Sequence, residues 1–296
     1  MMESATKQEC GEIEYARCLS ELNAFFSTIR PDNSVLLLDE LLDHLDKKSI
    51  RFAYFIDALL GTDLWKGLYF ESNPYPKLCH DLAICIDELN SSFEFEPPYH
   101  SRKHFVDVCV GISALLSQNV ERDEVQQLSP WILSKEDSWL LLFAAIGHDY
   151  MHRGRINSVD YENELISLNG LQLFLNQYSN FSSEYKQNLM EKLHRLILPT
   201  CFDFTHLLYE KINKGMGDQL DCLAMLLTEA DILASTLPNR GKVLSKRLSL
   251  EWQDQNKELS KFVASKEGYD AFLQKVQFLS AQSKKLNVIH FKNNLI

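Results

Sequence analysis

Glycine, proline and alternating sequence patterns are scarce in this chain. Its 296 residues include only 11 glycines and 8 prolines, and strict alternation of apolar and polar residues is rare. These shortages argue against a protein built from many short strands and turns. Apolar residues recur instead with the 3.6-residue period of a helix. We therefore predict an all-α protein, a compact bundle of many helices.

Long apolar runs and an excess of positive charge are also absent. The longest apolar run, Leu140 to Gly147, is far shorter than the ~20 residues that cross a bilayer, and the polar segment from Met1 to Cys10 does not resemble a signal peptide. The formal net charge is −11, which argues against a nucleic acid polymer as partner because phosphate neutralisation needs a basic face. A small phosphorylated substrate stays open, since bound cations can reverse the local field. We expect a soluble cytoplasmic protein that has no membrane partner.

Paired cysteines are missing as well. The seven cysteines stand at positions 10, 18, 79, 85, 109, 201 and 222. They are odd in number and never form a Cys-x-x-Cys pair, so we interpret them as small buried hydrophobes in a reducing compartment.

Helical periodicity divides the chain into many segments. It predicts helices over residues 34–45, 50–60, 78–89, 104–118, 134–148, 165–178, 184–198, 206–212, 219–236, 251–264 and 268–282. Ser134 followed by Asp137 predicts a capping box, residues 92–98 a break, 153–160 a loop and 238–241 a turn. We predict a helical N-terminal subdomain over residues 1–75 and a second domain over residues 76–296.

The most informative residues follow the apolar run that ends at Gly147. His148 and Asp149 come next, and a carboxylate beside an imidazole at such a place is costly unless something compensates it. His100 and His104 are four residues apart and can share a helical face. Asp231 lies on an apolar helical stripe, where a carboxylate is paired, protonated or bound to a metal.

These side chains make a mixed nitrogen and oxygen set, which suits Zn, Mn, Fe or, with waters, Mg. Each has a simpler interpretation by itself. A single histidine is more often a packed or surface residue than a ligand, and Asp231 alone could pair with Arg240 or Lys242. The combination favours a metal site.

The order of these segments resembles the HD superfamily of metal-dependent phosphohydrolases, and within it the catalytic domain of class I 3′,5′-cyclic nucleotide phosphodiesterases. The similarity covers roughly residues 95–280. It lies in the segment Tyr99-His100-Ser101 with His104, in the pattern His-Asp-x-x-His-x-Gly-x-x-Asn from His148 to Asn157, and in Asp231. Leu198-Pro199-Thr200 with His206 is similar to a further threonine-and-histidine segment of that family.

The resemblance implies a fold, a cofactor and a reaction. The second domain would be an HD-type catalytic domain with two divalent metal ions (Zn, Mn, Mg or Fe), and Asp149 would bridge them. The ligands of the first ion would be His104, His148, Asp149 and Asp231. Residues near the second ion or the substrate would be His152, Asn157, Glu164, Thr200 and His206. His100 would be the general acid in the hydrolysis of a nucleotide phosphodiester, such as cyclic AMP or cyclic GMP, by a hydroxide that the two metals activate.

The sequence also departs from that family. Members that select purines use a glutamine followed by a short spacer and a phenylalanine, and here Gln274 and Gln277 stand near Phe278 at other spacings. Ser101 replaces the usual asparagine. Two alternatives therefore stay open: a phosphohydrolase acting on another nucleotide or a phosphomonoester, and a non-catalytic HD scaffold that binds a nucleotide or a protein.

Overall fold

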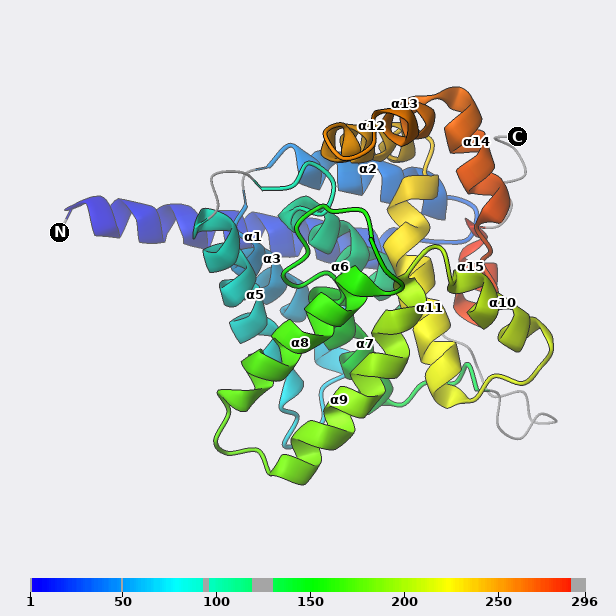
Figure 1. Ribbon diagram of the computed structural model, residues 1–296. Coiled ribbons are helices and arrows are strands. Elements are labelled where there is room, and N and C mark those ends of the chain that lie inside the picture. The colour runs from blue at the N-terminus through cyan, green and yellow to red at the C-terminus, as the bar shows by residue number, and fades with distance from the viewer. Residues whose placement is uncertain (1, 49, 93–95, 119–129, 289–296) are drawn as a thin grey trace.

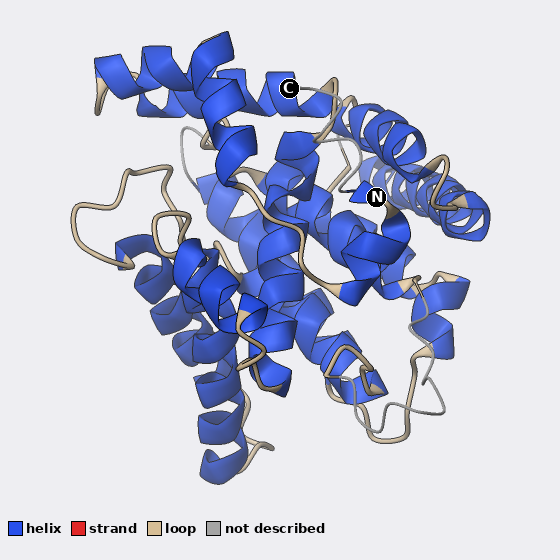
Figure 2. Cartoon of the chain, turned by 90° about the vertical axis from the view of Figure 1, so that its right-hand side faces the viewer, coloured by secondary structure: helices blue, strands red, loops and turns tan. Residues whose placement is uncertain are grey.

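A computed structural model describes residues 2–48, 50–92, 96–118 and 130–288. Within these ranges the regular structure is entirely helical, with no strand, which confirms the all-α prediction (Figures 1 and 2). None of the helices in the described ranges has both the length and the apolar character of a membrane span.

Fifteen α-helices and two 3-10 turns follow one another along the described chain. They are α1 (Met2–Thr28), α2 (Ser34–Asp46), α3 (Phe52–Leu60), α4 (Asp63–Gly67), α5 (Tyr75–Ser92), α6 (Arg102–Leu116), α7 (Lys135–Gly147), α8 (Glu162–Asn176), α9 (Ser183–Ile197), η1 (Leu198–Thr200), α10 (Thr205–Asn213), α11 (Gln219–Leu233), η2 (Ala234–Thr236), α12 (Arg240–Trp252), α13 (Lys257–Ala264), α14 (Lys266–Lys275) and α15 (Ala281–Leu286).

Helices α6, α7 and α11 form the centre of the molecule. Residues 104–115 of α6, residues 138–147 of α7 and nearly all of α11 are buried, as expected of helices that are apolar on every side. A Cβ atom at Gly111 would lie 3.1 Å from the carbonyl oxygen of Ala230, so this glycine permits the close packing of α6 on α11. Figure 1 shows α8 and α9 on one side of this centre and α12, α13 and α14 gathered at one end.

Most predicted helices are present, and α7 begins with the predicted capping box of Ser134 and Asp137. The predicted bounds were wrong over residues 238–282. Residues 238 and 239 form the expected turn, but α12 already begins at Arg240, because a proline just before a helix is compatible with helix initiation. Asn256 and Ser280 accept hydrogen bonds from Leu259 N and Ser283 N, so new helices begin inside both predicted segments. Helices α1 and α4 had no counterpart among the predicted segments.

One hydrophobic core includes side chains from both sides of the predicted border at residue 75. Phe52 and Leu59 of α3 belong to the same buried cluster as Leu82 of α5 and Phe105 of α6. The described N-terminal helices thus complete the core that carries α6, and the border itself stays a prediction.

The cysteines are mostly buried, as predicted. Cys18, Cys79, Cys109, Cys201 and Cys222 are buried free thiols, and Cys85 is partly exposed. The side chain of Cys10 lies outside the described residues.

A buried ionic network joins α2, α6 and α12. The guanidinium of Arg240 is 1% exposed and lies 2.7 Å from Asp107 and 3.0 Å from Asp46. Asp46 also pairs with Arg247 at 2.7 Å. These contacts assign Arg240 to the network, so it is not the partner of Asp231.

A second buried carboxylate, Glu229 of α11, holds the start of α15. It accepts hydrogen bonds from the backbone N–H groups of Leu279 and Ser280 and from the hydroxyls of Ser280 and Ser283. Burial raises its pKa, although these donors favour the charged form. The C-terminal segment is therefore fastened to α11 two residues before Asp231.

Candidate metal centre

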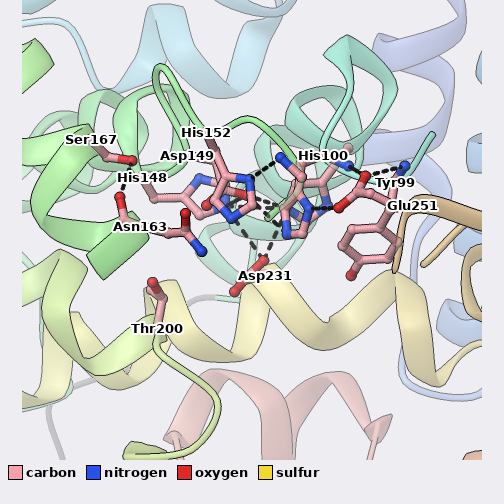
Figure 3. Close-up of polar contacts among 12 residues, drawn as sticks. Tyr99, His100, His148, Asp149, His152, Asn163, Ser167, Thr200, Asp231 and Glu251 are labelled. Carbon is pink, nitrogen blue, oxygen red and sulfur yellow. Dashed lines mark hydrogen bonds and ion pairs between the residues drawn. The ribbon is translucent and has the colours of Figure 1, made fainter. Parts of the chain in front are cut away.

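Four predicted ligands from three central helices converge on one point, and Figure 3 labels three of them, His148, Asp149 and Asp231. His104 comes from α6, His148 and Asp149 follow the end of α7, and Asp231 comes from the last turn of α11. Nε2 of His104 lies 3.2 Å from Nε2 of His148, 3.2 Å from Asp149 Oδ2 and 3.1 Å from Asp231 Oδ1. Nε2 of His148 lies 3.2 Å and 3.4 Å from the same two oxygens.

These spacings fit a divalent cation. Ligand atoms at about 2.0–2.1 Å from an ion in a tetrahedral or octahedral shell lie about 2.9–3.4 Å apart. Nδ1 of His148 donates to the carbonyl oxygen of Ala145 at 2.9 Å, so the lone pair of this ring is on Nε2, on the side of the carboxylates. Nδ1 of His104 is buried without a hydrogen-bond partner among the described residues, so the polar contacts of this ring are made by Nε2 on the converging side.

The charges of this cluster also favour a cation. Burial opposes the charged form of each group, but the mutual attraction outweighs it. The pKa of Asp231 falls to about 2 and that of His104 rises to about 9. The same forces lower the pKa of Asp149 and raise that of His148. The two carboxylates thus attract positive charge strongly, and a bound divalent cation would take the place of the protons on the imidazoles.

His100 lies beside this cluster in the loop before α6, and Glu251 of α12 orients it. Nδ1 of His100 donates to Glu251 Oε1 at 2.5 Å, and the backbone N–H groups of Tyr99 and His100 donate to Oε2 at 2.8 Å and 3.0 Å. Nε2 of His100 lies 3.9 Å from Asp149 Oδ2. Burial lowers the pKa of His100, but Glu251 and Asp149 outweigh it and raise the pKa.

The loop after Asp149 is shaped to fit the end of α12. Gly154 has a φ of +68°, and a Cβ atom there would lie 2.6 Å from the carboxyl carbon of Glu251. Gln255 donates to the carbonyl oxygen of Gly154 and accepts from the N–H of Ile156, both at 2.8 Å. Only glycine fits position 154 without strain, because φ is positive there and a Cβ atom would overlap Glu251. The loop therefore follows α12 closely.

His152 of this loop stacks on His100, with ring centroids 3.8 Å apart. Its Nδ1 accepts from the N–H of Gly154 at 2.9 Å. Burial, followed by the charge of His100, lowers the pKa of His152 to about 3. Because Nδ1 accepts, a neutral His152 carries its proton on Nε2, which can donate a hydrogen bond to a ligand.

A cavity of about 410 Å³ opens over the cluster. It is lined by Tyr99, His100, Asp149, His152, Asn157, Asn163, Glu164, Thr200 and Asp231 among others. Asn157 donates to Glu164 at 3.3 Å and accepts from the N–H of Asn163 at 3.0 Å. Burial, and secondarily Asp149, raises the pKa of Glu164. The predicted residues Asn157, Glu164 and Thr200 are thus brought to the cavity.

Three other predicted site residues do not line the cavity. His206 is exposed on α10, and its Nδ1 donates to the carbonyl oxygen of Asp203 at 3.0 Å. Gln274 and Gln277 are exposed as well, and Gln277 accepts from Asn213 at 3.4 Å. The residues of α14 that line the cavity are Gly268, Tyr269, Ala271, Phe272 and Lys275, so the helical period turns Gln274 away from the site.

Glu251 is the functional candidate that was not predicted from the sequence. The predicted helix over residues 251–264 began at this glutamate, so the apolar residues that precede it in α12 were not considered together with it. Within α12, Leu244, Leu248 and Glu251 recur at helical spacing, so a carboxylate follows an apolar stripe. The same signal identified Asp231.

Comparisons of the sequence with protein-family models and with curated proteins return no match. The chemistry of the site is therefore inferred from its geometry.

Proposed function

We propose that this protein is a metal-dependent phosphodiesterase of the HD type that hydrolyses a nucleotide phosphodiester, with 3′,5′-cyclic nucleotides as its substrates. The observation that carries the proposal is the convergence of two imidazole nitrogens and two carboxylate oxygens, 3.1–3.4 Å apart across each His–Asp pair. The two aspartates and His100 line the cavity, and the two imidazoles are buried behind them. No structural ion pair requires two histidines and two aspartates to meet in this way.

His104, His148, Asp149 and Asp231 would hold one divalent cation. Asp149 also lies in a second group of His and Asp side chains, with His100 and His152, so its carboxylate could be shared with a second cation. In this scheme the two histidines keep their protons, and water would complete the shell of that cation. Bound cations would polarise the phosphoryl group, stabilise its developing charge and lower the pKa of the attacking water.

His100 would supply the proton for the leaving oxygen. Because the N–H group at Nδ1 donates its hydrogen bond to Glu251, the proton for the leaving oxygen would come from Nε2, the nitrogen nearer to Asp149. An alkoxide is a poor leaving group, and general acid catalysis of this kind contributes about 10²–10⁴-fold. Glu251 is a positioning residue in this scheme, since it contacts His100 and two backbone N–H groups.

The size and charge of the cavity suit a nucleotide. Its volume of about 410 Å³ falls within the range of about 300–1,000 Å³ for small-molecule sites. Arg155 and Lys275 line it and would offset the negative charge of a phosphate ester. We also propose the cytoplasm as its location, since the six cysteines with described side chains are free thiols.

The test is hydrolysis of cyclic AMP and cyclic GMP by purified protein with Mn²⁺ or Mg²⁺. His104→Ala and Asp149→Asn should abolish turnover and lower the metal content measured by elemental analysis. His206→Ala, at an exposed position outside the cavity, is the matched histidine control and should retain activity. A protein with full metal occupancy that cleaves no phosphodiester refutes the proposal. Faster cleavage of p-nitrophenyl phosphate than of bis(p-nitrophenyl) phosphate would indicate a phosphomonoesterase instead.

A further inference from the structure

Helix α8 begins the longest stretch of the chain without charged side chains. Residues 165–183, which run from α8 to the start of α9, contain no Asp, Glu, Lys, Arg or His. At the 24% charged content of the whole chain, about four or five charged residues would be expected over this length. The helix itself is charged only in its first turn, at Glu162 and Glu164. The uncharged runs of α6 and α7 belong to buried helices, whereas one face of α8 is exposed to solvent.

This exposed side of α8, here called the outer face, is also apolar. The opposite side of the helix is buried in the hydrophobic core, against α7 and α9. The outer face keeps three large apolar side chains in solvent, with exposed fractions of 41% at Leu165, 39% at Ile166 and 64% at Leu173. Asn169 and Asn176 are exposed among them. Leucine, isoleucine and amide side chains therefore make up this face.

Three other exposed leucines have charged neighbours. Leu36 of α2, Leu207 of α10 and Leu250 of α12 are each more than half exposed. Each has a charged residue three or four positions away in its helix, where side chains are neighbours. Leu173 has none within eight positions on either side. Single exposed apolar side chains are ordinary on a protein surface, but an apolar face without charge is typical of the centre of an interface.

The composition of the outer face is self-complementary. In a two-fold symmetric interface each side chain meets the same patch of the other copy. Charged side chains repel one another in such an arrangement, whereas leucine packs on leucine and an amide both donates and accepts hydrogen bonds. The chain has a formal net charge of −11, so two copies repel each other where their charged surfaces meet. The outer face of α8 is a surface on which this repulsion is small.

We propose that two copies of this chain associate through the outer face of α8, with Leu173 near the two-fold axis. Leu173 is near the middle of the uncharged stretch. The inference does not rest on the proposed activity, because the residues of α8 that line the cavity are Asn163 and Glu164, which are outside this face.

The size of the outer face indicates the strength of the association. Helix α8 has 15 residues, so the face is a strip about 22 Å long and about 10 Å wide. That is less than the ~800 Å² per partner of a standard interface. We therefore expect a weak dimer with a Kd of about 1–100 µM.

Analytical ultracentrifugation of the full chain tests the proposal. Over about 1–200 µM the wild type should change from monomer to dimer. Leu173→Glu should raise the Kd at least about tenfold, because each dimer would then hold two carboxylates near its axis. The matched control is Leu36→Glu, at a 58% exposed leucine of α2, which should dimerise as the wild type does. Both positions are exposed, so both variants should keep the wild-type circular dichroism spectrum.

Two measurements without added charge give independent readouts. Replacing Leu173 by the photocrosslinker p-benzoylphenylalanine should give a covalent dimer on irradiation, and the same replacement of Leu36 should not. Raising NaCl from about 0.15 M to 0.5 M should lower the Kd or leave it unchanged, because screening reduces the repulsion between two acidic copies.

A wild-type chain that stays monomeric at about 200 µM overturns the inference and leaves the outer face of α8 to a different protein. Equal Kd values for the wild type and a folded Leu173→Glu variant overturn it as well. The same holds for crosslinking from position 36 that is as strong as from position 173, and for a dimer that salt weakens, since that dimer would depend on ion pairs.

Discussion

The link between Glu251 and His100 gives the sharpest quantitative prediction. The carboxylate of Glu251 accepts three N–H groups at 2.5–3.0 Å, one of which is Nδ1 of His100. In Glu251→Gln the single amide oxygen can keep the two backbone donors, but the amide nitrogen cannot accept from Nδ1. One charge-assisted hydrogen bond is lost, which is worth about 1.5–3 kcal/mol and corresponds to about a ten- to 150-fold effect.

The assay compares two leaving groups. The leaving group of cyclic AMP is an alkoxide, which needs a proton. The leaving group of bis(p-nitrophenyl) phosphate is a stabilised phenolate, which does not. We expect Glu251→Gln to lower kcat for cyclic AMP by about ten- to 150-fold, with little change in KM, and to alter turnover of the aryl diester by less than about threefold. Equal losses on both substrates would refute the positioning of a general acid and would make Glu251 merely structural.

Further predictions concern the loop, the ionic network and the metal. Gly154→Ala should reduce activity as Glu251→Gln does, because the added Cβ atom displaces the Glu251 carboxyl group. The matched control is Gly215→Ala, at the same φ of +68° and with no atom within 4 Å of the added Cβ. It should lower stability by about 1–2 kcal/mol and leave kcat unchanged. Burial would raise the pKa of Asp46, but Arg247 and Arg240 outweigh it and lower it from 3.8 to about 2. A carboxylate whose pKa is lowered by folding stabilises the fold at pH values above its pKa in the unfolded chain. In urea titrations, Asp46→Asn should therefore lower the unfolding free energy by about 2 kcal/mol at pH 7 and by about half of that at pH 3. A difference that does not change with pH would contradict this. Chelation should stop turnover and lower Tm, and Mn²⁺ should restore both, with no response in Asp231→Asn.

The central helices were predictable because they depend on local sequence signals, whereas the set of four candidate ligands was implied by the resemblance to the HD superfamily. Helix α7 has a capping box and a continuous apolar run, and both are properties of neighbouring residues. Asp231 was identified because a carboxylate interrupts an apolar stripe. These signals do not depend on the tertiary contacts of the residues concerned.

The surroundings of the metal centre were harder to predict because they depend on distant contacts. The role proposed for Glu251 depends on its hydrogen bonds with two backbone N–H groups and an imidazole about 150 residues earlier in the chain. The sequence of α12 does not indicate these partners. Gln274 and Gln277 were misplaced because the start of α14 sets which side chains face the cavity. That start depends on Ser265, whose hydroxyl accepts from the N–H of Gly268.

The hydrogen bonds that Glu229 accepts from residues 279–283 make the C-terminal segment important for the structure around Asp231. A chain truncated before Leu279 would lose the backbone and hydroxyl donors of Leu279, Ser280 and Ser283. The carboxylate of Glu229 would then be buried in α11 without these partners, about half a turn from Asp231. Such a deletion should disturb the candidate metal centre although it removes no residue of that site. A purification tag therefore should not replace residues 279–283.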